Sequence, residues 1–160
     1  MQARRILGFD PGYGRLGFGV IDFAKHEAAY VSCGVLTTPA GGRMGERLYE
    51  IARDVRTLFD KYQPQEMVIE ALFFAKNTTT ALQVAEVRGV LLLLAEEAGI
   101  PVKEVKPVEV KLALTGYGKA DKKQMQEMIK TVLRLPSVPQ PDDAADALAI
   151  AWTGAGKLIV

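Results

Sequence analysis

The hydrophobic pattern at the start of the chain has the two-residue period of β-strands. Residues 6–9 form a short apolar run, and apolar residues alternate with small ones at 16–20. A third strand is expected at about 29–37. Because the connections between these segments are short, the strands should pair in antiparallel order. The pattern therefore predicts an antiparallel meander of three strands.

From Met44 onward the apolar residues recur at the spacing of an α-helix, until Pro64 interrupts the pattern. Further helices and strands follow, separated by prolines and glycines that end each element. The expected strands in this part are 67–69 and 102–105, and the expected helices are 44–62, 79–98, 108–114, 122–135 and 142–152.

This order of elements predicts an α/β fold in a single domain, residues 1–160. Its five-stranded mixed sheet would contain three antiparallel strands and then parallel ones, flanked by helices on both faces. We find no internal repeat, low-complexity tract or linker that would divide the chain.

Composition narrows the class of protein. The chain has 160 residues, of which 49% are hydrophobic and 24% charged, and its net charge is +1. These values exclude a disordered chain and a wholly basic nucleic-acid coat protein. Cys33 is the single cysteine, and the sequence shows neither a signal peptide nor an apolar run of membrane length. We therefore expect a cytoplasmic location and no membrane partner.

Four acidic residues occupy positions where the pattern otherwise predicts buried structure. Asp10 and Glu70 each end an apolar strand. Asp143 and Asp146 lie three residues apart on a helix otherwise rich in Ala, Leu and Ile, so they share a face. A buried carboxylate is costly unless it is paired or binds a cation. If the four acids meet at one sheet edge, they supply the hard oxygen ligands that Mg²⁺ and Mn²⁺ prefer.

Most of these acids also have a simpler interpretation. Asp10 can belong to a turn, and Glu70 can be exposed where its strand emerges. Asp142 or Asp143 can cap the last helix, and Asp142 also lies four residues before Asp146 and could share its face. Asp146 is the hardest to explain in this way because its sequence neighbours are apolar. Taken together, the four positions favour a metal site.

Three segments, FDPG at 9–12, EALFFAKN at 70–77 and DAADALA at 143–149, resemble the RuvC family of bacterial Holliday junction resolvases in order and spacing. The similarity spans nearly the whole chain. It implies a ribonuclease H-like fold and a homodimeric, Mg²⁺-dependent endodeoxyribonuclease. Such an enzyme resolves four-way DNA junctions by paired symmetric nicks during recombination and DNA repair.

Carried over position by position, the resemblance implies that Asp10, Glu70, Asp143 and Asp146 are both the catalytic acids and the metal ligands. Two Mg²⁺ ions are expected in each site, and Mn²⁺ can replace them. A pair of ions can activate the attacking water and stabilise the leaving oxygen. We hypothesise that Asp10 bridges them. The DAAD spacing selects Asp143, which leaves Asp142 as the expected cap of the last helix.

Basic residues outnumber acidic ones in the segment 103–134, as suits phosphate contact, although a solvated helix face explains the same charges equally well. The resemblance implies DNA contacts by one aromatic residue and five lysines: Phe73, Lys76, Lys111, Lys119, Lys122 and Lys123. Lys111 and Lys122 are expected nearest the scissile phosphate. Phe73 is expected to stack on an unpaired base, whereas Phe74 would pack in the core.

Two symmetric nicks require two related sites, which a two-fold dimer supplies. The apolar segment 84–94 is the expected interface, although the pattern fits a central core helix equally well. The resemblance also implies cooperation with the RuvA–RuvB branch-migration complex. Three alternatives stay open: a non-catalytic junction-binding module, a ribonuclease H-like nuclease for another nucleic acid, and an ATP-binding protein of the actin and sugar-kinase kind. The last is suggested by Gly17 and Gly19, which follow Asp10 as in a phosphate loop.

Overall fold

In the computed structural model, which describes residues 2–12, 14–72 and 78–157, one mixed sheet runs through the molecule. Its strands are β1 (Arg4–Pro11), β2 (Arg15–Ala24), β3 (Glu27–Thr37), β4 (Glu66–Glu70) and β5 (Val102–Val105). They lie in the order β3-β2-β1-β4-β5. β1, β2 and β3 pair in antiparallel order, whereas β4 and β5 continue the sheet in parallel with β1. The predicted five-stranded mixed sheet is confirmed.

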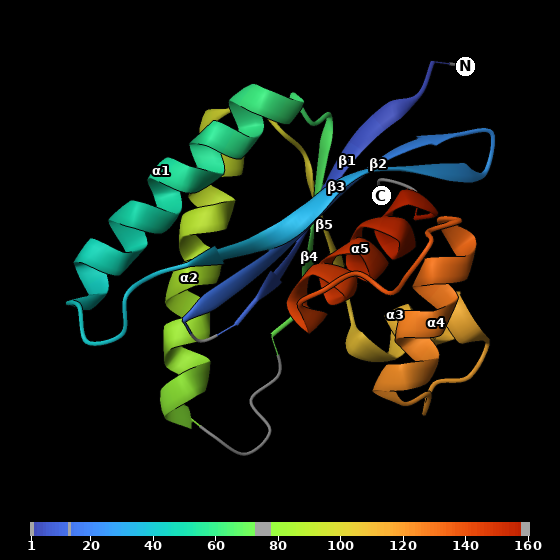
Figure 1. Ribbon diagram of the computed structural model, residues 1–160. Coiled ribbons are helices and arrows are strands. Elements are labelled where there is room, and N and C mark those ends of the chain that lie inside the picture. Colours follow the sequence, from blue (N-terminus) through green and yellow to red (C-terminus); the bar gives the residue numbers. More distant parts are fainter. Residues whose placement is uncertain (1, 13, 73–77, 158–160) are drawn as a thin grey trace.

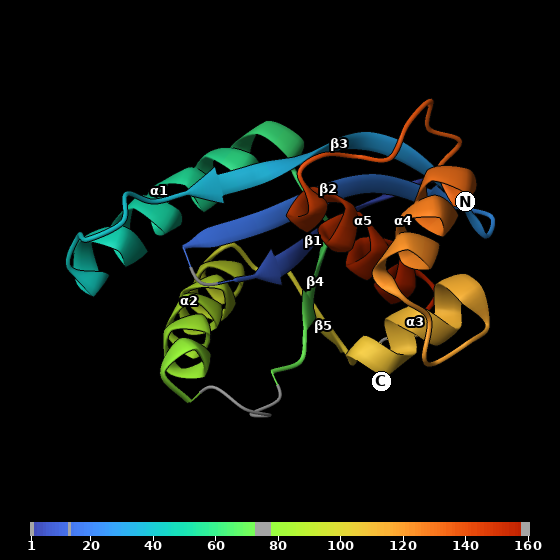
Figure 2. The same cartoon turned by 60° about the horizontal axis from the view of Figure 1, so that its bottom comes forward.

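Helices cover both faces of this sheet, as Figures 1 and 2 show. On one face lie α1 (Met44–Tyr62) and α2 (Thr78–Glu97). On the other lie α3 (Pro107–Thr115), α4 (Lys122–Val132) and α5 (Asp142–Ala155). Each face has its own apolar core, built from the inward side chains of the strands and the facing helices. Among the described residues, no helix is long and apolar enough to cross a membrane.

Two helix ends differ from the prediction by three residues, whereas the others agree within one residue. α4 ends at Val132 rather than 135, although the apolar spacing continues through Leu133. Arg134 has a φ of 54°, and the Leu135 N–H donates to the Lys130 carbonyl over 2.9 Å. A left-handed residue with this hydrogen bond closes a helix, so the chain turns while Leu133 stays buried. α5 continues three residues beyond the predicted end, to Ala155.

The alternation of side chains along β1 determines where its terminal acid points. Leu7 and Phe9 are buried in the core beneath α1 and α2, whereas Ile6 belongs to the core on the opposite face. Successive side chains of a strand point to opposite faces, so Gly8 and Asp10 share the face of Ile6. That face is the one covered by α5. Asp10 is therefore directed toward α5 by the two-residue period that buries Leu7 and Phe9.

Glycines in β1 and β2 allow the backbone of α5 to lie directly against the sheet. A Cβ atom built at Gly17 would lie 2.2 Å from the Asp143 carbonyl oxygen, and one at Gly19 would lie 2.6 Å from the Leu148 nitrogen. Gly8, paired with Gly19 across the two strands, is similarly close to α5. Close packing of α5 explains these glycines. Gly17 and Gly19 therefore do not support the interpretation as the phosphate loop of an ATP-binding protein.

Candidate active site

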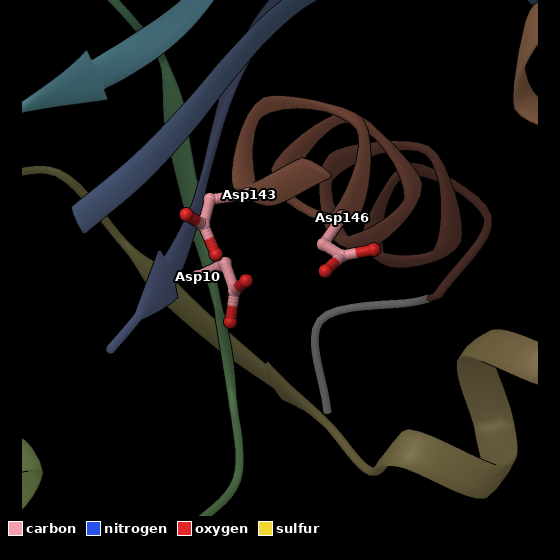
Figure 3. A group of neighbouring side chains, drawn as sticks. All are labelled: Asp10, Asp143 and Asp146. Atoms are coloured by element: carbon pink, nitrogen blue, oxygen red, sulfur yellow. The ribbon is translucent and has the colours of Figure 1, made fainter. Parts of the chain in front are cut away.

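Three of the four predicted acids lie together at one edge of the sheet. Asp10 stands near the end of β1, and Asp143 and Asp146 stand in the first turns of α5 (Figure 3). Each offers a carboxylate oxygen, and these oxygens lie within 4.8 Å of one another. The three side chains are partly buried. The strand alternation and the close packing of α5 thus bring together acids that are more than 130 residues apart in the chain.

Glu70 reaches the same region from the neighbouring strand. β1 and β4 are parallel, with Phe9 opposite Ile69, so Asp10 and Glu70 follow these partners at the same edge. Glu70 and Asp10 both line a cavity of about 320 Å³, to which Asp146 also contributes. Glu70 is not part of the group of three whose oxygens approach within 4.8 Å. The structure therefore places Glu70 beside the cluster rather than inside it.

The expected capping role of Asp142 is wrong. The N-cap residue of α5 is Pro141, and no side chain caps this helix. Asp142 instead contacts α4: its Oδ2 lies 3.1 Å from Lys122 Nζ, and its Oδ1 accepts a hydrogen bond from Gln126 Nε2 over 3.1 Å. α4 packs alongside the start of α5, so a carboxylate there meets the polar face of α4 before it can fold back onto its own helix.

Two of the predicted lysines line the acid-bearing cavity, namely Lys111 of α3 and Lys122 of α4. Lys122 is the first residue of α4, and a reciprocal capping box holds that helix start in place. In this box the Asp121 side chain accepts from the Gln124 N–H over 2.8 Å, and the Gln124 side chain accepts from the Asp121 N–H over 2.9 Å. Lys122 Nζ lies 3.7 Å from Asp146 Oδ2. A cationic group is thus fixed at the rim of the acid cluster.

The other predicted DNA contacts are placed differently. Lys119 and Lys123 are exposed and lie outside the lining of this cavity. Phe73 and Lys76 lie outside the described residues. Lys103, at the start of the basic segment, is buried, with its Nζ 2.8 Å from Glu66 Oε2. That lysine therefore serves the interior of the fold and does not add to the basic surface.

Sequence reasoning missed Arg15, which approaches the cluster from the start of β2. Its Nε lies 3.1 Å from Asp143 Oδ2, and its side chain is 51% exposed. One sequence signal could have indicated it. A basic residue at the start of a strand that pairs with β1 lies at the same sheet edge as Asp10, since β1 and β2 are antiparallel neighbours.

The crowding of acids shifts their proton affinities. The pKa of Asp10 is raised to about 7, first by burial and then by the charges of Asp146, Glu70 and Asp143, while Lys122 opposes the shift. The pKa of Glu70 is raised, first by burial and then by Asp146. The pKa of Asp146 is likewise raised, chiefly by burial, although Lys122 acts in the opposite direction. The cluster is therefore a concentration of negative charge for which the nearby basic groups do not fully compensate.

The raised pKa of Asp10 predicts that the metal-free protein loses stability as the pH rises. This carboxyl has a pKa of 3.8 in its ordinary state and about 7 in the folded chain, so folding favours its protonated form. The resulting contribution to the free energy of unfolding is complete below about pH 4 and is lost as the pH rises through about 7. Its size is on the order of 4 kcal/mol.

This prediction is measured by urea unfolding in the presence of a chelator at pH 5 and pH 8. We expect the free energy of unfolding to fall more between these pH values in the wild type than in Asp10→Asn, because an amide does not titrate. An equal fall in both proteins would contradict the assigned pKa shift. The difference should also shrink when a divalent cation is added, since the cation stabilises the ionised acids.

The donor set of the cluster fits a hard divalent cation. Carboxylate oxygens are the ligands preferred by Mg²⁺, Mn²⁺ and Ca²⁺, and three acidic residues at this spacing repel one another until a cation is bound. His26, the single histidine, lies in the exposed turn between β2 and β3, and Cys33 lies on β3. The softer ligands that would favour zinc thus lie away from the cluster.

Comparisons with known proteins agree on one family. The family model "Crossover junction endodeoxyribonuclease RuvC" matches residues 6–154. The protein of that name from Roseiflexus sp. (strain RS-1) is 52% identical over 151 residues, which cover 94% of this chain and 90% of that protein. Its counterpart from Thermotoga maritima is 48% identical over 152 residues, covering 95% and 90% of the two chains.

Solved structures give the same result. The chain is similar to Thermus thermophilus RuvC in complex with a Holliday junction substrate, with a TM-score of 0.89 and 34% identity. That match covers 95% of this chain and 93% of the other. The yeast mitochondrial Holliday junction resolvase Ydc2, at 16% identity and a TM-score of 0.69, shares the fold.

Proposed function

Because this chain belongs to the RuvC family of crossover junction endodeoxyribonucleases, we propose that it resolves four-way DNA junctions by hydrolysing phosphodiester bonds at the acid cluster. The observation that carries this proposal is the juxtaposition of Asp10, Asp143 and Asp146 at a cavity whose lining also includes two lysines, Lys111 and Lys122. Acids of this kind hold divalent cations, and basic residues attract the phosphates of DNA. The site therefore combines both requirements of metal-assisted nuclease chemistry.

We assign Asp10, Asp143, Asp146 and Glu70 to the binding of the catalytic cations, which we expect to be two Mg²⁺ ions. When bound, such ions supply Lewis-acid stabilisation of the phosphate charge and lower the pKa of an attacking water. Asp10 is central because its pKa responds to the charges of all three other acids. We propose it as the acid shared between the cations. Glu70 lines the cavity and would complete the ligand set on the side of β4.

The basic residues around the cluster would hold the substrate phosphate. Lys111 and Lys122 line the cavity with the acids, so a phosphate drawn toward the cations meets both ammonium groups. Arg15 lies on the other flank, beside Asp143. If Asp143 were engaged by a cation, the Arg15 guanidinium that now pairs with it would be available to contact a phosphate. Lys119, Lys123, Phe73 and Lys76 stay predicted DNA contacts of the surrounding surface.

Three substrates distinguish a junction resolvase from a nuclease for another nucleic acid and from a binding module that does not cleave. Wild type and Asp146→Asn are incubated with Mg²⁺ and either a mobile four-way junction, a linear duplex or an RNA–DNA hybrid. We expect cleavage of the junction alone, absent in the variant. Cleavage of the hybrid would indicate a nuclease with the substrate of a ribonuclease H. Tight junction binding without cleavage in Mg²⁺ or Mn²⁺ would indicate a binding module.

We further propose that α2 forms the interface of a homodimer. One side of α2 packs in the core through Val87, Leu91 and Leu94. Its opposite side exposes Leu82 and Leu93, which are 60% and 58% accessible. The core interpretation of segment 84–94 applies to one side of the helix, and the other side is the one that we propose for the interface. The exposed leucines lie eleven residues apart, on one side of the helix. Association of two copies along this stripe would remove them from water.

The dimer is tested by introducing a charge into this stripe. We expect Leu93→Glu to be monomeric at micromolar concentration, because burying an unpaired carboxylate in an apolar interface costs several kcal/mol (about 3–5). The control is Leu112→Glu, the same change at a half-exposed leucine of α3, which should leave the mass measured by light scattering unchanged. A monomeric wild type, or a dimeric Leu93→Glu protein, would contradict the proposed interface.

Cooperation with the RuvA–RuvB complex and a cytoplasmic location, both expected from the sequence, stay predictions. A pull-down with purified RuvA–RuvB on junction DNA tests the first of these directly.

A further inference from the structure

Asp142 is not a member of the acid cluster, but it forms an ion pair with Lys122, whose ammonium group lies beside that cluster. Its carboxylate lies 3.1 Å from Lys122 Nζ, whereas Asp146, which is in the cluster, lies 3.7 Å from the same nitrogen. The ammonium group therefore sits between an acid that is expected to bind a cation and one that is not. Asp142 is the nearer of the two.

The Asp142 carboxylate, which is 51% exposed, has a second partner on α4. Its second oxygen accepts the hydrogen bond from Gln126 Nε2 over 3.1 Å. Lys122 and Gln126 lie four residues apart on α4, so they present one face of this helix to the start of α5. Asp142 thus has one oxygen for each of these two residues.

An ammonium group and a divalent cation compete for the same carboxylate oxygens. Without Asp142, the nearest acid left to Lys122 is Asp146. An ammonium that closed onto Asp146 would neutralise a ligand and repel an incoming cation. The Lys122 ammonium already lies within ion-pairing distance of Asp146, at 3.7 Å, and Asp142 offers the nearer partner, at 3.1 Å, that keeps the contact with Asp146 long.

We propose that Asp142 is a positioning residue that holds the Lys122 ammonium away from Asp146 and so leaves Asp146 available to a divalent cation. This inference rests on the proposed binding of such a cation by Asp10, Asp143 and Asp146. It predicts that Asp142 acts on metal affinity through Lys122, and not merely by adding a negative charge near the site.

The test is a double-mutant cycle on metal binding by the DNA-free protein. Mn²⁺ is titrated by calorimetry into wild type, Asp142→Asn, Lys122→Met and the double variant. We expect Asp142→Asn to weaken Mn²⁺ binding about fivefold or more in the wild-type background, within the range of coupling found for residues in contact. In the Lys122→Met background the same change should alter affinity less than about twofold, since no ammonium is left to misplace.

Asparagine at 142 can still accept the hydrogen bond from Gln126, so this variant preserves the contact between α4 and α5. Asp142→Glu, which retains a carboxylate, should recover part of the lost affinity. In junction cleavage, the Mg²⁺ concentration that gives half the maximal rate should rise for Asp142→Asn by a factor similar to the loss in metal affinity. Thermal unfolding with a chelator present reports whether each variant folds.

Equal weakening of Mn²⁺ binding by Asp142→Asn in both backgrounds would overturn the proposal, because it would indicate a simple charge effect. Unchanged binding by Asp142→Asn would also overturn it. Asp146→Asn distinguishes this failure from that of the proposed function. If Asp146→Asn binds Mn²⁺ as tightly as the wild type, the cation site itself is wrong, and the role of Asp142 fails with it.

Discussion

Replacing Asp10 by asparagine is expected to reduce junction cleavage by at least about 10³-fold, because the metal contribution to such a transition state is worth several kcal/mol. Asp10 faces the two acids of α5 and feels the charges of every other acid in the site. An amide removes the anionic ligand while preserving the shape of the side chain. Cleavage of a labelled four-way junction under single-turnover conditions measures the effect.

The loss of cleavage should come from the chemical step and not from a loss of DNA binding. Asp10→Asn should still bind the junction when Ca²⁺ replaces Mg²⁺, since the basic residues at the rim are untouched. The matched control is Asp60→Asn, the same chemical change at an exposed position near the end of α1, which should cleave at the wild-type rate. Substantial cleavage by Asp10→Asn would contradict the assignment of this acid to the cations.

The second large effect is expected from Gly17→Ala, a change that adds one methyl group. The new Cβ would lie 2.2 Å from the Asp143 carbonyl oxygen and 2.7 Å from its carbonyl carbon. Both are backbone atoms, so no side-chain rotation relieves the contact and the start of α5 must move by about 1 Å. A displacement of that size in a catalytic group can lower the rate about 100-fold.

Gly17→Ala should also lower the free energy of unfolding by about 1–3 kcal/mol, as overpacking of a tight interface does. Gly45→Ala in α1 provides the control, because a Cβ there meets nothing within 4 Å and the residue is helical. It should leave cleavage unchanged. A Gly17→Ala enzyme with wild-type activity would show that the position of α5 is not set by this contact.

The sheet and three acids of the site, Asp10, Glu70 and Asp146, could be predicted because each depends on a local sequence pattern. The two-residue alternation in β1 buries Leu7 and Phe9 and thereby directs Asp10 to the α5 face. The parallel strand β4 repeats the same pattern and ends at Glu70 on the same edge. Asp146 was conspicuous because an ionisable residue amid alanines on a buried helix requires a partner.

What could not be predicted depends on contacts between distant segments. The ion pairs of Arg15 with Asp143 and of Lys122 with Asp142 join residues on separate elements. The sequence can place a basic residue such as Arg15 at the right sheet edge, but no periodicity indicates which acid it meets. Asp142 looked like a helix cap because an acidic residue after a proline commonly is one. Gly17 also fits a phosphate loop in the sequence, since a glycine required for close packing has the same appearance there.

A supercoiled plasmid that carries an extruded four-way cruciform tests most directly whether two such sites act together on one junction. Paired nicks within one binding event convert the plasmid directly to the linear form, whereas a single nick relaxes the cruciform and leaves an open circle. We expect linear product from the wild type and neither product from Asp146→Asn. Open circles as the lasting product of the wild type would contradict the account.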